Sequence, residues 1–250
     1  MARMLNLGCG RRFHPDWVNV DFRSSGPGVL ACDLSRGLCF ADQSFDVVYH
    51  SHVLEHFPKP QAPGFLRECL RVLRPGGVLR CAVPDLETIA RLYLRLLEGA
   101  SAGDSTSRER YEWIMLELLD QMVRERSGGE MLAHWKREPM PAEDFVIERV
   151  GSEVRRALAA VRAAKRAAPA AWTRPTAAEI GAFRLSGEAH HWMYDRYSLA
   201  RLLEEAGFKE PRVRRADESA IPGFNAFLLD IEADGSTRKP DSLFMEAFRP

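Results

Sequence analysis

Glycine and aspartate residues follow short apolar runs near the start of the chain. Gly8 and Gly10 come directly after Met4–Leu7, while Asp21 ends "WVNVD" and Asp33 ends "GVLACD". Glycine allows a ligand to approach the backbone closely. A carboxylate can accept hydrogen bonds from both hydroxyls of a ribose, and a second one can accept from an exocyclic amine such as that of adenine. The pattern predicts a nucleoside site.

Histidine residues form a second group that could do chemistry. His52 lies in "YHSHVLEH", and His191 precedes Tyr194 in "HHWMYD". An imidazole can take a proton from a hydroxyl group at neutral pH, so His52, His191 and Tyr194 are the candidate catalytic residues. The alternative for His191 and Tyr194 is packing of the neighbouring segment on the core. His52 and His56 lie four positions apart with Glu55 between them, but a further ligand is missing, so we predict no metal site. Glu55 and His56 are assigned to packing at a helix start.

Strand and helix patterns alternate in the first hundred residues. Strand-like apolar runs lie at 4–7, 17–22, 45–49 and 78–83, and apolar residues recur at helical spacing over 65–73. Short buried strands separated by helices imply a mostly parallel sheet. Only "RRFHPD" separates Gly10 from Trp17, whereas a parallel crossover normally needs a dozen or more residues. Either this crossover is a single short turn or one strand is misassigned; we keep both strands.

The pattern changes after residue 98, where "EGASAGDSTS" indicates a loop. Two amphipathic helices are expected next, one opening with a Thr106–Glu109 capping box and one beginning after Pro141. The second helix ends in a basic cluster formed by Arg155, Arg156, Arg162, Lys165 and Arg166. A helix at 197–208 and strands at 211–215, 226–231 and 242–248 follow. We therefore predict a core at 1–98, a helical insertion at 99–189 and a C-terminal part of the core at 190–250.

The composition excludes several classes of protein. Lys+Arg and Asp+Glu balance at 35 each, which gives no electrostatic reason to expect a nucleic acid partner. The five cysteines form no Cys-x-x-Cys pair, so neither a zinc site nor a disulfide framework is indicated. No apolar run approaches eighteen residues, and we expect no membrane span and a cytoplasmic location.

A dinucleotide-binding dehydrogenase is the rival interpretation of the glycine pair. Its fingerprint needs a third glycine three places after the second one, where this chain has Phe13. The fingerprint also places an acidic residue about twenty positions further on, whereas Asp21 follows Gly10 by eleven. A pyrophosphate would lack its cradle, so this interpretation is disfavoured.

Several segments in order resemble class I S-adenosylmethionine-dependent methyltransferases, of the small-molecule type with a "VLEH" segment after the fourth strand. They are "LNLGCG", "WVNVD", "CDLSRGLCFADQSFDVVYHSHVLEHF" and "LRVLRPGGVLRCAVPD". The resemblance implies an α/β fold, a Rossmann-like parallel sheet with an antiparallel C-terminal strand pair and a helical insertion. It also implies S-adenosyl-L-methionine as the cofactor. The residues that it assigns to cofactor binding are Asn6, Gly8, Cys9, Gly10, Asp21, Asp33, Leu34, His50 and Ser51.

The chain departs from this family at three points, one of which is Cys39, where a proline is common. Asn6 stands where an acidic residue is usual, and the first helix is nearly absent, so the carboxylate of the cofactor would rely on Arg11, Arg12 or the backbone nearby.

We expect a methyltransferase that acts on a small-molecule acceptor and methylates an oxygen atom. "YHSH" replaces the Asn/Asp-Pro-Pro-aromatic motif typical of enzymes that methylate bases or glutamine. The alternative is a methyltransferase-like scaffold that binds the cofactor or its product without turnover. The sequence leaves open whether the insertion closes over a substrate or mediates contacts in a homodimer.

Overall fold

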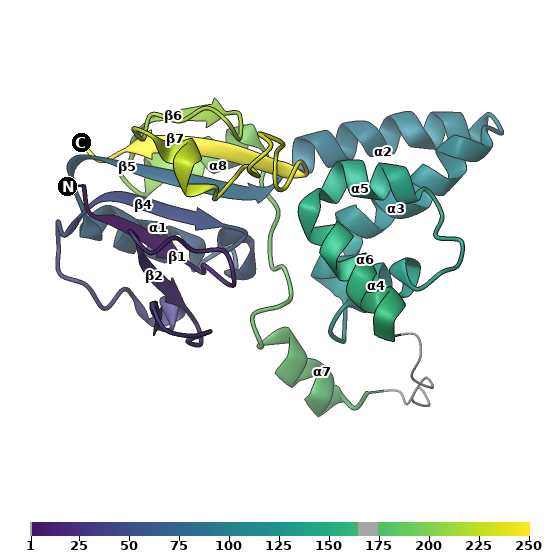
Figure 1. Ribbon diagram of the computed structural model, residues 1–250, viewed down its shortest axis with the longest axis horizontal. Helices are drawn as coiled ribbons and strands as arrows, with labels where there is room; N and C mark the ends of the chain where they lie inside the picture. Colours follow the sequence, from purple (N-terminus) through teal and green to yellow (C-terminus); the bar gives the residue numbers. More distant parts are fainter. Residues whose placement is uncertain (1, 165–174) are drawn as a thin grey trace. The chain divides into compact units, whose positions relative to one another are not determined.

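The computed structural model describes residues 2–164 and 175–250, so the predictions for Lys165 and Arg166 fall outside the described residues. The chain forms two compact units (Figure 1). The first comprises Met1–Asp85, His191–Thr237 and Ser242–Pro250, and the second comprises Leu86–His190 and Arg238–Asp241. The second unit begins at Leu86 and includes four residues from the C-terminal region, Arg238–Asp241. The predicted domain boundaries stay a prediction.

The first unit is built on a seven-stranded sheet with the order β3-β2-β1-β4-β5-β7-β6. Its strands are β1 Met4–Leu7, β2 Val18–Asp21, β3 Val29–Ala31, β4 Phe45–Ser51, β5 Leu73–Pro84, β6 Lys209–Arg214 and β7 Ser242–Phe248. The strand β7 runs antiparallel to β5 and β6, and the remaining pairs are parallel. The predicted fold class is confirmed, because a mostly parallel sheet closes with an antiparallel C-terminal pair.

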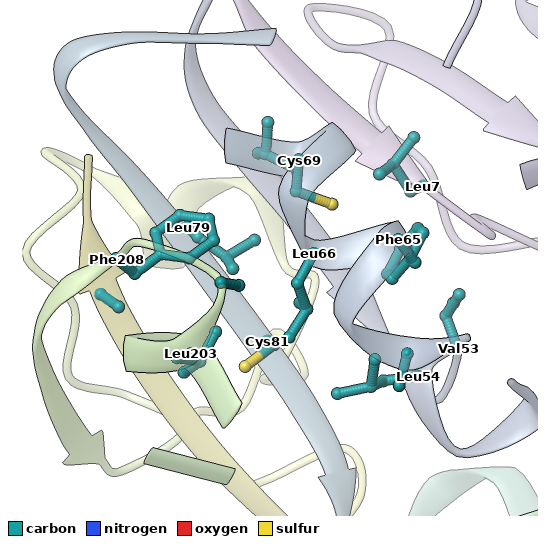
Figure 2. Packing of buried hydrophobic residues seen from close by; sticks show 14 of the residues in the cluster. Leu7, Val53, Leu54, Phe65, Leu66, Cys69, Leu79, Cys81, Leu203 and Phe208 are labelled. Carbon is teal, nitrogen blue, oxygen red and sulfur yellow. The ribbon is translucent and has the colours of Figure 1, made fainter. Parts of the chain in front are cut away.

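One face of this sheet is covered by the helices α1 Ala62–Val72 and α8 Arg196–Glu205. Figure 2 shows Leu66 of α1 and Leu203 of α8 against Cys81 of β5. The apolar residues of α1 recur at spacings of three and four, which places them on a single stripe that faces the sheet. Asp195 caps α8 by accepting from the backbone amides of Tyr197 and Ser198.

The opposite face is covered by irregular chain from the C-terminal region. Phe224 lies in the 3-10 helix η3 Phe224–Phe227 and packs with Trp17 and Tyr49. The strand predicted at 226–231 is wrong, since η3 and bends occupy most of these residues and Ile231 forms an isolated bridge with Thr237. Polar interactions with the sheet fix the segment instead of ladder hydrogen bonds.

The second unit is helical. It contains α2 Leu86–Ser101, α3 Ser105–Val123, α4 Gly129–Trp135, α5 Glu143–Val150, α6 Ser152–Ala164 and α7 Ala177–Arg184. Asp104, rather than Thr106, caps α3. The single helix predicted after Pro141 is divided at Gly151, where φ is +77° and an added Cβ would lie 2.3 Å from the carbonyl oxygen of Arg238. Among the described residues, no helix combines the length and apolar character needed to cross a membrane.

Candidate cofactor and proton-transfer site

The site lies at the carboxyl ends of β1, β2 and β4. The strand order reverses between β1 and β4, because the chain continues from β1 to β2 on one side and reaches β4 on the other. Open parallel sheets bind ligands at such a switch point, outside the carboxyl ends of the strands. The predicted residues Gly8, Gly10 and Asp21 follow or end these strands.

Gly10 and Asp21 are joined directly. The backbone amide of Gly10 donates to Oδ2 of Asp21 at 2.6 Å, and the amide of Phe22 donates to Oδ1 at 2.6 Å. Each carboxylate oxygen therefore keeps acceptor capacity for a further hydrogen bond. Both glycines adopt positive φ, +64° at Gly8 and +56° at Gly10, and such values favour glycine.

The space around the two glycines differs. An added Cβ at Gly8 would lie 2.3 Å from Cγ2 of Val53, so the loop after β1 needs glycine to pass the loop after β4. An added Cβ at Gly10 would meet no heavy atom within 4 Å. The first glycine permits close packing, and the second leaves open room beside the Asp21 carboxylate.

Asn6 and Cys9 face inward. The Nδ2 of Asn6 donates to the Arg12 carbonyl at 3.3 Å and to Oδ1 of Asn19 at 3.2 Å. Asn19 in turn donates to the carbonyls of His14 and Trp17 at 2.9 Å each. Burial and the nearby Asp21 raise the pKa of the Cys9 thiol to about 11, so the thiol stays protonated at neutral pH. The Asn6 amide thus stabilises the short crossover between β1 and β2.

Arg12 is engaged by the C-terminal segment. Its Nε donates to the Leu228 carbonyl at 2.7 Å, and its Nη2 donates to the Ile231 carbonyl at 3.2 Å and to Glu232 at 3.1 Å. These three partners hold the guanidinium at the irregular segment on the second face. Arg11 is the exposed arginine of the pair.

Asp33 and Leu34 lie directly after β3. Oδ1 of Asp33 accepts from the amide and the hydroxyl of Ser35, at 3.0 and 2.6 Å, and so caps the 3-10 helix η1 Leu34–Arg36. Among the described residues, Oδ2 of Asp33 has no hydrogen-bond partner. Leu34 lines a groove of about 600 Å³ whose other wall includes Phe57 and Gly64. The capping role and a ligand contact are compatible, because they use different oxygens.

His50 lies within β4, not beyond it, and its side chain is fully buried beside Phe65. Neither of its ring nitrogens has a hydrogen-bond partner in the described part of the chain. Burial lowers its pKa to about 3, which keeps the ring neutral. Ser51 is the last residue of the strand and is partly buried.

His52, which follows β4, has the polar surroundings that His50 lacks. Its Nε2 lies 2.7 Å from Oγ of Ser242, and its Nδ1 lies 3.5 Å from Oε1 of Glu55. Glu55 belongs to the 3-10 helix η2 Leu54–His56 and is fully buried. His52 adopts φ of +54°, which is rare for a residue with a side chain.

The segment that follows the helical unit carries His191 and Tyr194, and it packs against η2. The amides of His191 and Trp192 donate to the Glu55 carbonyl at 2.7 and 3.3 Å. Burial and the Glu55 carboxylate raise the pKa of the Tyr194 phenol, which therefore stays protonated at neutral pH. The structure thus gathers all three candidate catalytic residues, His52, His191 and Tyr194, around Glu55.

Two residues of this cluster were not predicted. Glu55 was visible in the sequence as part of "VLEH", where it was assigned to packing at a helix start. Ser242 opens a predicted strand, and no local pattern links it to His52, which lies 190 positions away.

Comparison with known proteins agrees with this geometry. The family described as "Methyltransferase domain" matches residues 14–81. This segment is similar to methyltransferase domains. The resemblance seen in the sequence is confirmed over these residues, and the similarity implies S-adenosyl-L-methionine as the cofactor.

Parts of the chain are similar to parts of other proteins. A ubiquinone biosynthesis O-methyltransferase of Parvibaculum lavamentivorans is 40% identical over 63 residues, 25% of this chain and 24% of that protein. A demethylmenaquinone methyltransferase of Corynebacterium glutamicum is 31% identical over 121 residues, 38% of this chain and 52% of that protein. A solved S-adenosylmethionine-dependent methyltransferase of Methanosarcina mazei aligns over 99% of this chain and 92% of its own, with 15% identity and a TM-score of 0.43. The matched segments thus span about half or less of the two named relatives.

Proposed function

We propose that the protein transfers a methyl group from S-adenosyl-L-methionine to a hydroxyl group of a small-molecule acceptor. The observation that carries this proposal is the Gly10–Asp21 contact at the switch point, with open space beside it. The methyltransferase domain at 14–81 includes Asp21, Asp33 and the end of β4. The acceptor class is suggested by the relative that is named as an O-methyltransferase.

The chain has suitable groups for each part of the cofactor. The remaining lone pairs of Asp21 would accept from the ribose hydroxyls, and Oδ2 of Asp33 with Leu34 would contact the adenine. Gly8, Cys9 and Gly10 would offer their backbone to the methionine part. The bound cofactor would supply an electrophilic methyl group on a sulfonium. Of the predicted contacts, Asn6 and His50 have surroundings that favour structural roles, whereas Ser51 stays a proposed contact.

His52 is the proposed general base, because it stands at the switch point next to a buried carboxylate. A hydroxyl acceptor must lose its proton as the bond to the methyl carbon forms, and a positioned base contributes typically 10²- to 10⁴-fold to such a step. His191 and Tyr194 would help to hold η2 and the acceptor. Tyr194 keeps its proton, so it would donate rather than accept.

The cofactor site is tested by calorimetric titration of S-adenosylhomocysteine into wild type, Asp21→Asn and the surface control Asp16→Asn. Loss of one pair of charge-assisted hydrogen bonds should weaken binding in Asp21→Asn by about 10- to 100-fold. Asp16→Asn should bind like wild type. Equal affinity of wild type and Asp21→Asn, with unchanged thermal melts, would contradict the proposed site.

The reaction is tested by following transfer of a radiolabelled methyl group to catechol and to other phenols. His52→Ala should lower kcat by roughly 10²- to 10⁴-fold while S-adenosylhomocysteine still binds. Tight binding without transfer to any hydroxyl acceptor would favour the scaffold without turnover.

A further inference from the structure

Ser242, His52 and Glu55 form a continuous row of polar side chains. Oγ of Ser242 lies 2.7 Å from Nε2 of His52, and Nδ1 of the same ring lies 3.5 Å from Oε1 of Glu55. The Glu55 side chain is fully buried, the His52 side chain is 17% exposed, and Ser242 is partly exposed. The row therefore leads from a buried carboxylate through an imidazole to a hydroxyl.

The order of these groups determines the tautomer of the ring. The Glu55 carboxylate lies 3.5 Å from Nδ1, and its charge favours the tautomer that carries the hydrogen on this nitrogen. The second nitrogen, Nε2, is then the one with the lone pair, and it accepts from the Ser242 hydroxyl. The basic atom of His52 is thus already in contact with a donor.

Rigid elements hold the row in place. The backbone amide of His52 donates to the Ala82 carbonyl of β5 at 2.9 Å, although the residue adopts φ of +54°. Ser242 pairs with Pro84 across the antiparallel β5–β7 ladder. Non-glycine residues kept at such φ values cost of order 1–3 kcal/mol and cluster at functional sites. A strained His52 fixed by two strands indicates that its position matters for function.

We propose that Ser242 relays the proton between the acceptor and His52, an inference that rests on the proposed methyl transfer. The lone pair of Nε2 is occupied by Ser242, so an acceptor hydroxyl reaches the base through this hydroxyl. The proton of the acceptor passes to Oγ of Ser242 as the proton of Ser242 passes to Nε2. The acceptor oxygen keeps the electron pair of its O–H bond and uses it for the bond to the methyl carbon, while the sulfonium sulfur keeps the pair of the broken C–S bond. Glu55 stabilises the imidazolium that results.

Kinetics with catechol and S-adenosylmethionine test the relay. Ser242→Ala should lower kcat by about 10- to 100-fold with little change in KM for catechol, because a water can replace the hydroxyl only in part. Ser242→Thr keeps a hydroxyl and should restore most of the rate. Ser236→Ala removes a hydroxyl from the Asp234–Ser236 turn, which is not part of the row, and serves as the matched control.

Solvent isotope effects separate a relay from a packing role. Two protons move together in the relay. A plot of the rate against the fraction of deuterium in the solvent should therefore be curved for wild type and Ser242→Thr. The dependence should become linear or vanish in Ser242→Ala. Wild-type kcat in Ser242→Ala, or a linear dependence in wild type, would overturn the relay.

A measurement that does not depend on catalytic turnover can test the relay separately from the proposed methyl transfer. Nitrogen-15 NMR of the His52 ring should show a protonated Nδ1 and a lone pair on Nε2 at neutral pH, and Glu55→Gln should shift this tautomer balance. If methyl transfer is absent but the predicted tautomer is present, the proposed function fails and the relay fails with it, while the Ser242–His52 hydrogen bond stands. If transfer occurs and the ring carries its proton on Nε2, the relay alone is wrong.

Discussion

His50 and His52 are two residues apart, yet their rings have opposite surroundings. The strand geometry of β4 turns the His50 side chain into the apolar layer beside Phe65, where its charged form is excluded. The strand ends before His52, which adopts a positive φ. This backbone conformation directs the His52 ring to Glu55 and Ser242. A backbone dihedral angle thus separates a packing residue from a proposed base.

The burial of His50 predicts a sensitivity to acid. Its folded pKa of about 3 lies below the usual value, so below about pH 6.5 the unfolded chain takes up a proton that the folded chain does not, and the free energy of unfolding falls with pH. His50→Leu should lose this part of the acid sensitivity, roughly 2–3 kcal/mol between pH 7.5 and pH 4.5. Urea denaturation at both pH values measures it.

The control for this experiment is Leu185→Gln, since the exposed Leu185 carries no titratable group and its replacement should leave the wild-type pH dependence unchanged. An unchanged pH dependence in His50→Leu would contradict a neutral buried His50.

The crossover from β1 to β2 shows how an element can be shortened without losing its register. No helix lies between these strands, and Asn6 and Asn19 bind the carbonyls of Arg12, His14 and Trp17 in place of helical hydrogen bonds. Gly8 and Gly10 lie in this crossover. The side-chain amides of Asn6 and Asn19 therefore help to hold the proposed cofactor site in its conformation. The acidic residue usual at position 6 would lack the donor that Asn6 supplies.

Removal of either amide should destabilise the protein. Asn6→Ala and Asn19→Ala should each lower the free energy of unfolding by about 1–3 kcal/mol, because buried carbonyls lose their donors. The double variant should lose less than the sum, since the two side chains share a hydrogen bond. Denaturant titration of all four proteins measures the coupling, with the exposed Asn225→Ala as control. Strictly additive losses would show that the two amides act independently.

At the scale of the whole molecule, distant segments complete the sheet. Arg80 of β5 is fully buried and binds Asp230 at 2.7 Å and Glu246 at 2.9 Å. Tyr49 donates to the same Asp230 at 2.6 Å. These contacts fix the irregular C-terminal segment over the face that helices would otherwise cover. A homodimer through the helical insertion stays a prediction.

Breaking this buried network should be costly. Arg80→Met leaves two buried carboxylates without their cation and should lower the free energy of unfolding by about 3–5 kcal/mol. The matched control is Arg74→Met, which breaks the exposed ion pair with Asp46 and should cost about 1 kcal/mol or less. Thermal or denaturant unfolding compares the two. Similar losses in both variants would contradict the structural role of the Arg80 network.

Local patterns predicted much of the fold. Apolar periodicity located β1, β2, β4, α1, α8 and β7, because each of these elements buries one regular stripe or run. It failed at 226–231, where an apolar run is held by η3 and side-chain contacts instead of a ladder. It also missed the break at Gly151, which depends on the close approach of Arg238.

By itself the sequence determined which residues end the strands at the nucleoside site, since glycine with positive φ and a strand-final carboxylate are local features. Only the tertiary structure decided which polar groups meet there. Arg12 is engaged by residues 228–232, and His52 meets Ser242, because the sheet order brings together segments that lie about two hundred positions apart. Such partners leave no trace in local spacing, since a contact across a sheet depends on the pairing of every strand between them.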